Sequence, residues 1–104
     1  MSIEEKIQRL QNGRIAAVTA YDFPTAKLVD EAGVDLVLVG DSLGMVFAGN
    51  PDTTTVTMEH MLYHTEIVAR GLENALLLSD LPYRTYQTPA EAVKNAKRLI
   101  SAGA

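Results

Sequence analysis

Two aspartates directly follow apolar stretches that have the composition of buried β-strands. Asp41 follows the run 34–40 (VDLVLVG), and Asp80 follows the run 75–79 (ALLLS). The carboxyl ends of parallel strands lie at one edge of a sheet or barrel, which is where active sites form in such folds. Neighbouring strands are about 5 Å apart, so the two carboxylates could share one cation. Carboxylate oxygens suit Mg²⁺, which leaves positions for water and substrate oxygens.

A substrate with adjacent carboxylate and keto oxygens could fill two of those positions, and the metal would then polarise the ketone as a Lewis acid. The alternative interpretation is that Asp41 and Asp80 each cap a loop or the start of a helix. Ser42 could bind a substrate carboxylate through its hydroxyl and the nearby backbone N–H groups, or it could be a simple turn residue. Thr19 and Tyr21, at the end of the first predicted strand, could line the same mouth or fill a barrel.

Other polar residues are better explained by structure than by chemistry. Asp22 is more typical of a helix cap than of a ligand. His60 and His64 are four residues apart on a predicted helix, but the spacing lacks the Glu of a His-Glu-x-x-His zinc site. Packing or surface roles are therefore favoured for both histidines.

The elements that would position these residues alternate between strand and helix. Strands are predicted at 14–20, 34–40 and 75–79, and the near-continuous apolar run of the second predicts cover on both faces. Helices are predicted after the caps Ser2, Asp22, Thr57 and Thr88, each ending near a glycine: Gly13, Gly33, Gly71 and Gly103. The helix after Thr57 should bury Met61, Leu62, Thr65 and Val68. The other helices each carry apolar residues on one face: Ile3, Ile7 and Leu10; Ala26, Val29 and Ala32; and Ala92, Val93, Ala96, Leu99 and Ile100. The long connector 41–57 is typical of a functional loop.

This order predicts an α/β fold with a parallel sheet and right-handed crossovers. Periodicity alone leaves open a barrel or an open doubly wound sheet, although the missing Gly-x-Gly-x-x-Gly turn disfavours a dinucleotide-binding version. The 104 residues, 47% of them hydrophobic, suffice for one small domain. With no cysteine, a net charge of −4 and no basic stripe, we expect neither disulfides nor a nucleic-acid partner. We see no signal peptide or membrane span, so a cytoplasmic location is expected.

Several blocks of the sequence closely resemble the ketopantoate hydroxymethyltransferase (3-methyl-2-oxobutanoate hydroxymethyltransferase) family. The most specific is the block 38–45 (LVGDSLGM), and the resemblance covers essentially the whole chain from Arg14 onward, in order. The other blocks are 19–22 (TAYD), 31–35 (EAGVD), 55–57 (TVT), 63–65 (YHT), 68–71 (VARG), 80–83 (DLPY) and 102–104 (AGA).

The resemblance implies a TIM (β/α)8 barrel of the phosphoenolpyruvate/pyruvate type, of which residues 1–104 would be the N-terminal part of a single domain: the leading helix and about three βα units. It implies transfer of a hydroxymethyl group from 5,10-methylenetetrahydrofolate to 3-methyl-2-oxobutanoate, giving 2-dehydropantoate in pantothenate biosynthesis. Mg²⁺ would be bound by Asp41 and Asp80, and the substrate by Asp41, Ser42 and Asp80. Family members are homo-oligomers, often decamers.

The family's Lys and Glu on the next strand, and its later Glu general base, have no counterpart in residues 1–104. No residue of this chain is therefore assigned as the base, and we expect the chain alone to be inactive, with an unpaired edge where a fourth strand would pair. Two alternatives remain open. The chain could be an inactive barrel fragment that acts only as an assembly piece, or part of another 2-oxo acid lyase of the same superfamily.

Overall fold

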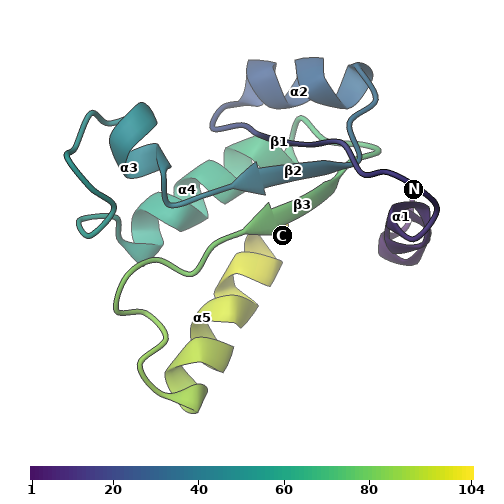
Figure 1. The fold of residues 1–104 in the computed structure, drawn as a ribbon. Helices are drawn as coiled ribbons and strands as arrows, with labels where there is room; N and C mark the ends of the chain where they lie inside the picture. Colours follow the sequence, from purple (N-terminus) through teal and green to yellow (C-terminus); the bar gives the residue numbers. More distant parts are fainter.

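Three short parallel strands form one sheet in the order of the chain (Figure 1). They are β1 (Ala17–Thr19), β2 (Leu36–Val39) and β3 (Leu76–Ser79), and the computed structural model describes all residues from 1 to 104. Val18 pairs with Val37, which pairs with Leu77. The predicted parallel sheet is confirmed, but each strand is shorter than its apolar run. At the start of β1, the side chain of Asp35 accepts the N–H of Ala16, so a side chain replaces a strand partner there.

Five helices connect and flank the strands. They are α1 (Ile3–Leu10), α2 (Phe23–Glu31), α3 (Leu43–Val46), α4 (Met58–Ala69) and α5 (Pro89–Ala102). The predicted caps are confirmed, because the side-chain oxygens of Ser2, Asp22, Thr57 and Thr88 each accept the N–H three residues further on. At the cap of α4, the ring of His60 also accepts the N–H of Thr57, which makes the cap reciprocal.

The connector 41–57 contains the short helix α3, which was not expected. Its Gly44 is buried where a β-carbon would lie 2.5 Å from Cγ2 of Val56. A glycine lowers helix propensity, which explains why the pattern concealed this helix. The glycine is needed because the later part of the same connector folds back against α3.

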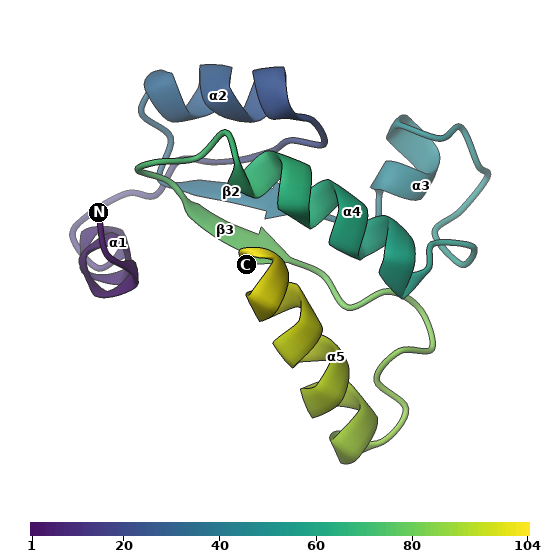
Figure 2. The same cartoon turned by 180° about the vertical axis from the view of Figure 1, so that it is seen from behind.

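Helices α2 and α4 cover one face of the sheet, and α4 crosses behind it in Figure 1 and in front of it in Figure 2. The core lies between these helices and the sheet, and Val37, Val39, Met61 and Val68 are fully buried there. Cover on both faces of β2 was predicted wrongly, since its alternate residues are only half-buried. Leu78, in register with Leu38 on the open face, is 49% exposed. Residues 1–104 thus supply one covered face.

The first and last helices are the most exposed. α1 has no buried residue and is tied to the start of β2 by Arg9, whose Nη2 lies 3.0 Å from Oδ1 of Asp35. On α5, Leu99 is buried, whereas Val93 and Ile100 are 54% and 65% exposed, so the predicted apolar stripe is only partly covered within residues 1–104. None of the helices has the length and apolar character needed to span a membrane.

Candidate functional site

Asp41 and Asp80 lie side by side at the carboxyl ends of β2 and β3. The N–H of Asp41 donates to Oδ2 of Asp80 over 3.0 Å, and both residues are half-buried. The N–H of Asp80 in turn donates to the carbonyl oxygen of Val39 over 3.1 Å, which continues the strand pairing. The parallel register therefore brings the two aspartates together, as the strand-end positions predicted.

Gly40 makes this close approach possible. A β-carbon at position 40 would lie 3.3 Å from Oδ2 of Asp80 and 3.3 Å from Oγ of Ser42. Both distances are tighter than ordinary van der Waals contacts, so a side chain there would push the two polar atoms away. The glycine before Asp41 thus leaves the Asp80 carboxylate and the Ser42 hydroxyl close to the same point of the backbone.

The pKa of Asp41 is raised by its surroundings. Burial raises the pKa of Asp41, and the neighbouring charge of Asp80 raises it further, while a hydrogen bond from the side chain of Thr53 acts in the opposite direction. Like charges at short range disfavour double ionisation. Without a cation, the site therefore carries repulsion that a divalent ion would relieve. Thr53 was not among the predicted site residues, since a run of three threonines in a loop gives no signal for one of them.

Ser42 is hydrogen-bonded to the end of β1. Its Oγ lies 2.8 Å from the hydroxyl oxygen of Tyr21, and both side chains are half-buried. The structure thus brings Tyr21 into contact with a predicted substrate-binding residue. From the sequence, Tyr21 could have lined the same mouth or filled a barrel. Thr19 belongs to β1 and is exposed on the open face of the sheet.

The remaining polar candidates have structural partners. Oδ1 of Asp22 accepts the N–H of Thr25 over 2.8 Å, so Asp22 is a helix cap as expected. The ring of His60 accepts the N–H of Thr57 over 3.0 Å, and Nδ1 of His64 lies 2.7 Å from the carbonyl oxygen of Tyr21. No pattern in the sequence indicated this link between His64 and Tyr21.

The donor set at the strand ends fits Mg²⁺. It consists of hard oxygen atoms on two adjacent carboxylates, which are the ligands that this ion prefers. The pKa of Asp41 is raised first by burial and then by the charge of Asp80. No group of three or more His, Cys, Asp or Glu gathers anywhere in the chain. Two carboxylates, with the other positions left to water and substrate, is the ligand count that Mg²⁺ commonly takes from a protein.

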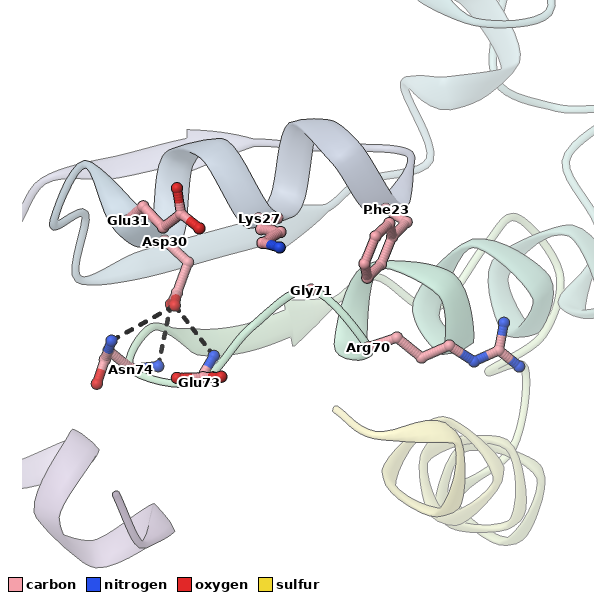
Figure 3. A pocket seen from close by; sticks show the side chains of 8 residues that line it. All are labelled: Phe23, Lys27, Asp30, Glu31, Arg70, Gly71, Glu73 and Asn74. Carbon is pink, nitrogen blue, oxygen red and sulfur yellow. Dashed lines mark hydrogen bonds between the residues drawn. The ribbon is translucent and has the colours of Figure 1, made fainter.

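A polar cavity of about 210 Å³ lies at the opposite end of the sheet, next to the segment that leads into β3 (Figure 3). Asp30, which is 5% exposed, points from α2 into this segment, and its carboxylate accepts the N–H groups of Glu73, Asn74 and Ala75. Every acceptor oxygen of Asp30 is thus engaged by the backbone. Asp30 and the three N–H groups that it accepts thus form a structural clamp. The cavity lies beside this clamp, far from the carboxylates of Asp41 and Asp80.

A family model of ketopantoate hydroxymethyltransferase matches residues 2–104. The chain belongs to this family. Among curated relatives, the 3-methyl-2-oxobutanoate hydroxymethyltransferase of Pyrobaculum islandicum is 62% identical over 88 residues, which are 84% of this chain and 34% of the relative. The enzyme of the same name from Ignicoccus hospitalis is 51% identical over 106 residues, covering 100% of this chain and 40% of the relative. The chain thus spans about a third of the length of the ketopantoate hydroxymethyltransferases that it matches.

Solved structures confirm the fold class. A phosphonopyruvate hydrolase in complex with oxalate and Mg²⁺ superposes with a TM-score of 0.81 at 21% identity, over 100% of this chain and 37% of that one. An oxaloacetate acetylhydrolase in complex with its product oxalate gives a TM-score of 0.74 at 19% identity, over 95% and 36% of the two chains. Both are barrels of the phosphoenolpyruvate/pyruvate type, so the three βα units have the arrangement found in that fold.

Proposed function

We propose that this chain provides the Mg²⁺ ligands and part of the substrate site of a ketopantoate hydroxymethyltransferase. The reaction is transfer of a hydroxymethyl group from 5,10-methylenetetrahydrofolate to 3-methyl-2-oxobutanoate, giving 2-dehydropantoate. The observation that carries the proposal is the contact between the N–H of Asp41 and the carboxylate of Asp80 at 3.0 Å, in a chain of this family. Residues 1–104 would be the N-terminal part of one barrel domain of a cytoplasmic homo-oligomer.

Asp41 and Asp80 would hold the metal, and Asp41, Ser42 and Asp80 would hold the oxo acid. When bound, Mg²⁺ would act as a Lewis acid on the oxo acid and favour loss of the proton next to the ketone. The carboxylates only accept hydrogen bonds when ionised, whereas Ser42 can donate one to a substrate carboxylate. With Asp41 and Asp80 assigned to the metal, the base that removes the proton at C3 would come from outside residues 1–104.

Calorimetric titration of the 104-residue chain with Mg²⁺ and 3-methyl-2-oxobutanoate tests the binding half of the proposal. We expect weak binding of the oxo acid that requires the metal, and loss of that binding in Asp80→Asn. Asp52→Asn is the matched control, because Asp52 is an exposed aspartate of the nearby loop whose carboxylate bonds only within its own turn, to Thr54. Equal binding by Asp80→Asn and the unsubstituted chain would contradict the ligand assignment.

A chimera tests the catalytic half. Residues 1–104 would replace the matching segment of the Pyrobaculum islandicum enzyme, and Mg²⁺-dependent turnover would be measured. We expect an active chimera that loses at least about 100-fold in rate with Asp41→Asn or Asp80→Asn, since even substitutions behind metal ligands cost 10–100-fold. The chain alone should not exchange the C3 proton of the oxo acid with deuterium. Exchange by the chain alone would show that a base lies within it.

A second candidate is that the chain acts as an assembly piece. A groove of about 280 Å³ between β3 and α5 is lined almost entirely by apolar residues: Leu77, Leu78, Leu81, Ala96, Leu99, Ile100 and Ala104, together with Ser79. Exposed apolar grooves of this kind mark association surfaces. Self-association without metal-dependent binding, measured by analytical ultracentrifugation alongside the titration, would favour this candidate over the first.

A further inference from the structure

Tyr21 joins α4 to the loop after β2 through two hydrogen bonds at opposite ends of one residue. Its carbonyl oxygen lies 2.7 Å from Nδ1 of His64, and its hydroxyl oxygen lies 2.8 Å from Oγ of Ser42. Because a carbonyl oxygen only accepts, Nδ1 of His64 is the donor in the first bond. The position of the Ser42 hydroxyl is therefore connected to a side chain on α4.

The surroundings of His64 hold its ring in one place. The residue is 6% exposed. The ring of Phe47 meets it edge-on with centroids 4.7 Å apart, and the ring of Tyr63 does so at 5.5 Å. A buried ring between two aromatic neighbours cannot turn toward water without losing these contacts and leaving the Tyr21 carbonyl unpaired. His64 thus fixes the backbone at the end of β1.

Tyr21 and Ser42 share two hydroxyl protons, one of which is used in the bond between them. If Tyr21 donates to Ser42, the hydroxyl of Ser42 is free to donate to a ligand; if Ser42 donates, the hydroxyl of Tyr21 is free. In both cases the pair keeps one hydroxyl proton free to donate. Ser42 directly follows Asp41, whose ionised carboxylate, like that of Asp80, only accepts. A ligand carboxylate needs such a donor, because the two aspartates repel it.

We propose that His64 is a positioning residue that acts through Tyr21 on the hydroxyl of Ser42, and that Tyr21 and Ser42 together offer one hydrogen bond to the carboxylate of the oxo acid. This inference rests on the proposed function and deepens it, because it adds two residues to the same substrate site. His64 itself touches neither the metal ligands nor the substrate.

Double-substitution analysis on the 104-residue chain tests the connection. With Mg²⁺ present, Tyr21→Phe and His64→Leu should each weaken binding of 3-methyl-2-oxobutanoate about ten-fold, the usual effect of one lost hydrogen bond. The double variant should bind as the single variants do, because His64 would act on Ser42 only through the hydroxyl of Tyr21. His64→Asn should restore binding, since its amide can donate from near the Nδ1 position. If His64→Leu weakens binding by the same factor with and without Tyr21→Phe, the connection does not exist.

A measurement without ligand separates this inference from the proposed function. If the unsubstituted chain binds no oxo acid, the proposed function fails, and the NMR signals of Ser42 then decide the inference. They should shift in His64→Leu and return in His64→Asn, and unchanged Ser42 signals in His64→Leu would overturn it. His60→Leu is the matched control, because His60 lies on the same helix and bonds to Thr57 at its cap; it should leave Ser42 unaffected.

Discussion

Asp30 on α2 accepts a 2.8 Å hydrogen bond from the N–H of Ala75, the residue that leads into β3. The same carboxylate accepts the N–H groups of Glu73 at 3.1 Å and Asn74 at 3.0 Å. One side chain thus satisfies three consecutive backbone donors, and the N–H of the buried Ala75 would otherwise have no partner. The contact fixes where β3 begins relative to the end of α2.

Replacing Asp30 with asparagine should lower the free energy of unfolding by about 1–3 kcal/mol, because an amide nitrogen would face backbone donors. Glu31→Gln is the control, since Glu31 is the exposed neighbour that lines the same cavity. Urea denaturation at neutral pH measures both. Equal stability of the two variants would contradict the role of the clamp.

The contribution of Asp30 should also depend on pH. Burial raises the pKa of Asp30, but the N–H groups of Ala75, Glu73 and Asn74 outweigh it and leave the pKa lowered. A depressed pKa adds stability above the unfolded-state value of about 3.9, and this stability is lost as the pH falls through the folded-state value. The stability difference between the unsubstituted chain and Asp30→Asn should therefore shrink in acid. A stability difference that stays constant to low pH would contradict a stabilising role for the ionised Asp30 carboxylate.

Asp41→Asn should make the metal-free chain more stable at neutral pH. Burial, and then the charge of Asp80, raise the pKa of Asp41, so its ionised form opposes folding once the pH exceeds that raised value. Mg²⁺ should reverse the order: at 100 times its dissociation constant it would stabilise the unsubstituted chain by about 2.7 kcal/mol, and the variant far less. Thermal unfolding in chelator and in Mg²⁺ measures this. The same order of stability in both buffers would be inconsistent with metal binding here.

Gly44→Ala should destabilise the chain by about 1–3 kcal/mol, although alanine normally favours a helix. The added β-carbon would lie 2.5 Å from Cγ2 of Val56. Combining it with Val56→Ala, which removes the opposing methyl groups, should recover part of the loss relative to Val56→Ala alone. Chemical denaturation of the four proteins in this cycle measures the coupling, and purely additive effects would exclude the contact as the cause.

Thr88→Ala should cost about 1 kcal/mol, since the Thr88 hydroxyl accepts the N–H of Glu91 at the start of α5. Ser101→Ala, at an exposed position near the other end of the same helix, is the control. Amide hydrogen exchange along α5 would locate the change. Fraying confined to the first turn is expected, and uniform protection in both variants would refute the cap.

The elements that local chemistry specifies were predicted well from the sequence. Capping side chains such as Thr57 and Thr88 act on donors three residues away, and the apolar runs before Asp41 and Asp80 contain the strands β2 and β3. The convergence of these two aspartates followed from the parallel topology alone.

What the sequence did not reveal depends on contacts between distant segments. α3 exists in spite of Gly44, whose role appears only when Val56 is packed against it. The bond from His64 to Tyr21 joins residues 43 positions apart and follows no periodic pattern. Val93 and Ile100 share the apolar character of Leu99, but only packing decides which of them is covered.

The clamp at Asp30 and the acidic pair at Asp41 and Asp80 lie at opposite ends of the same strands. The four residues of β2 separate them by roughly 13 Å. Substitutions at one end of the strands should therefore have little energetic effect at the other end. Evolution or protein engineering can therefore change thermal stability through substitutions around Asp30 while the site at Asp41 and Asp80 stays unchanged.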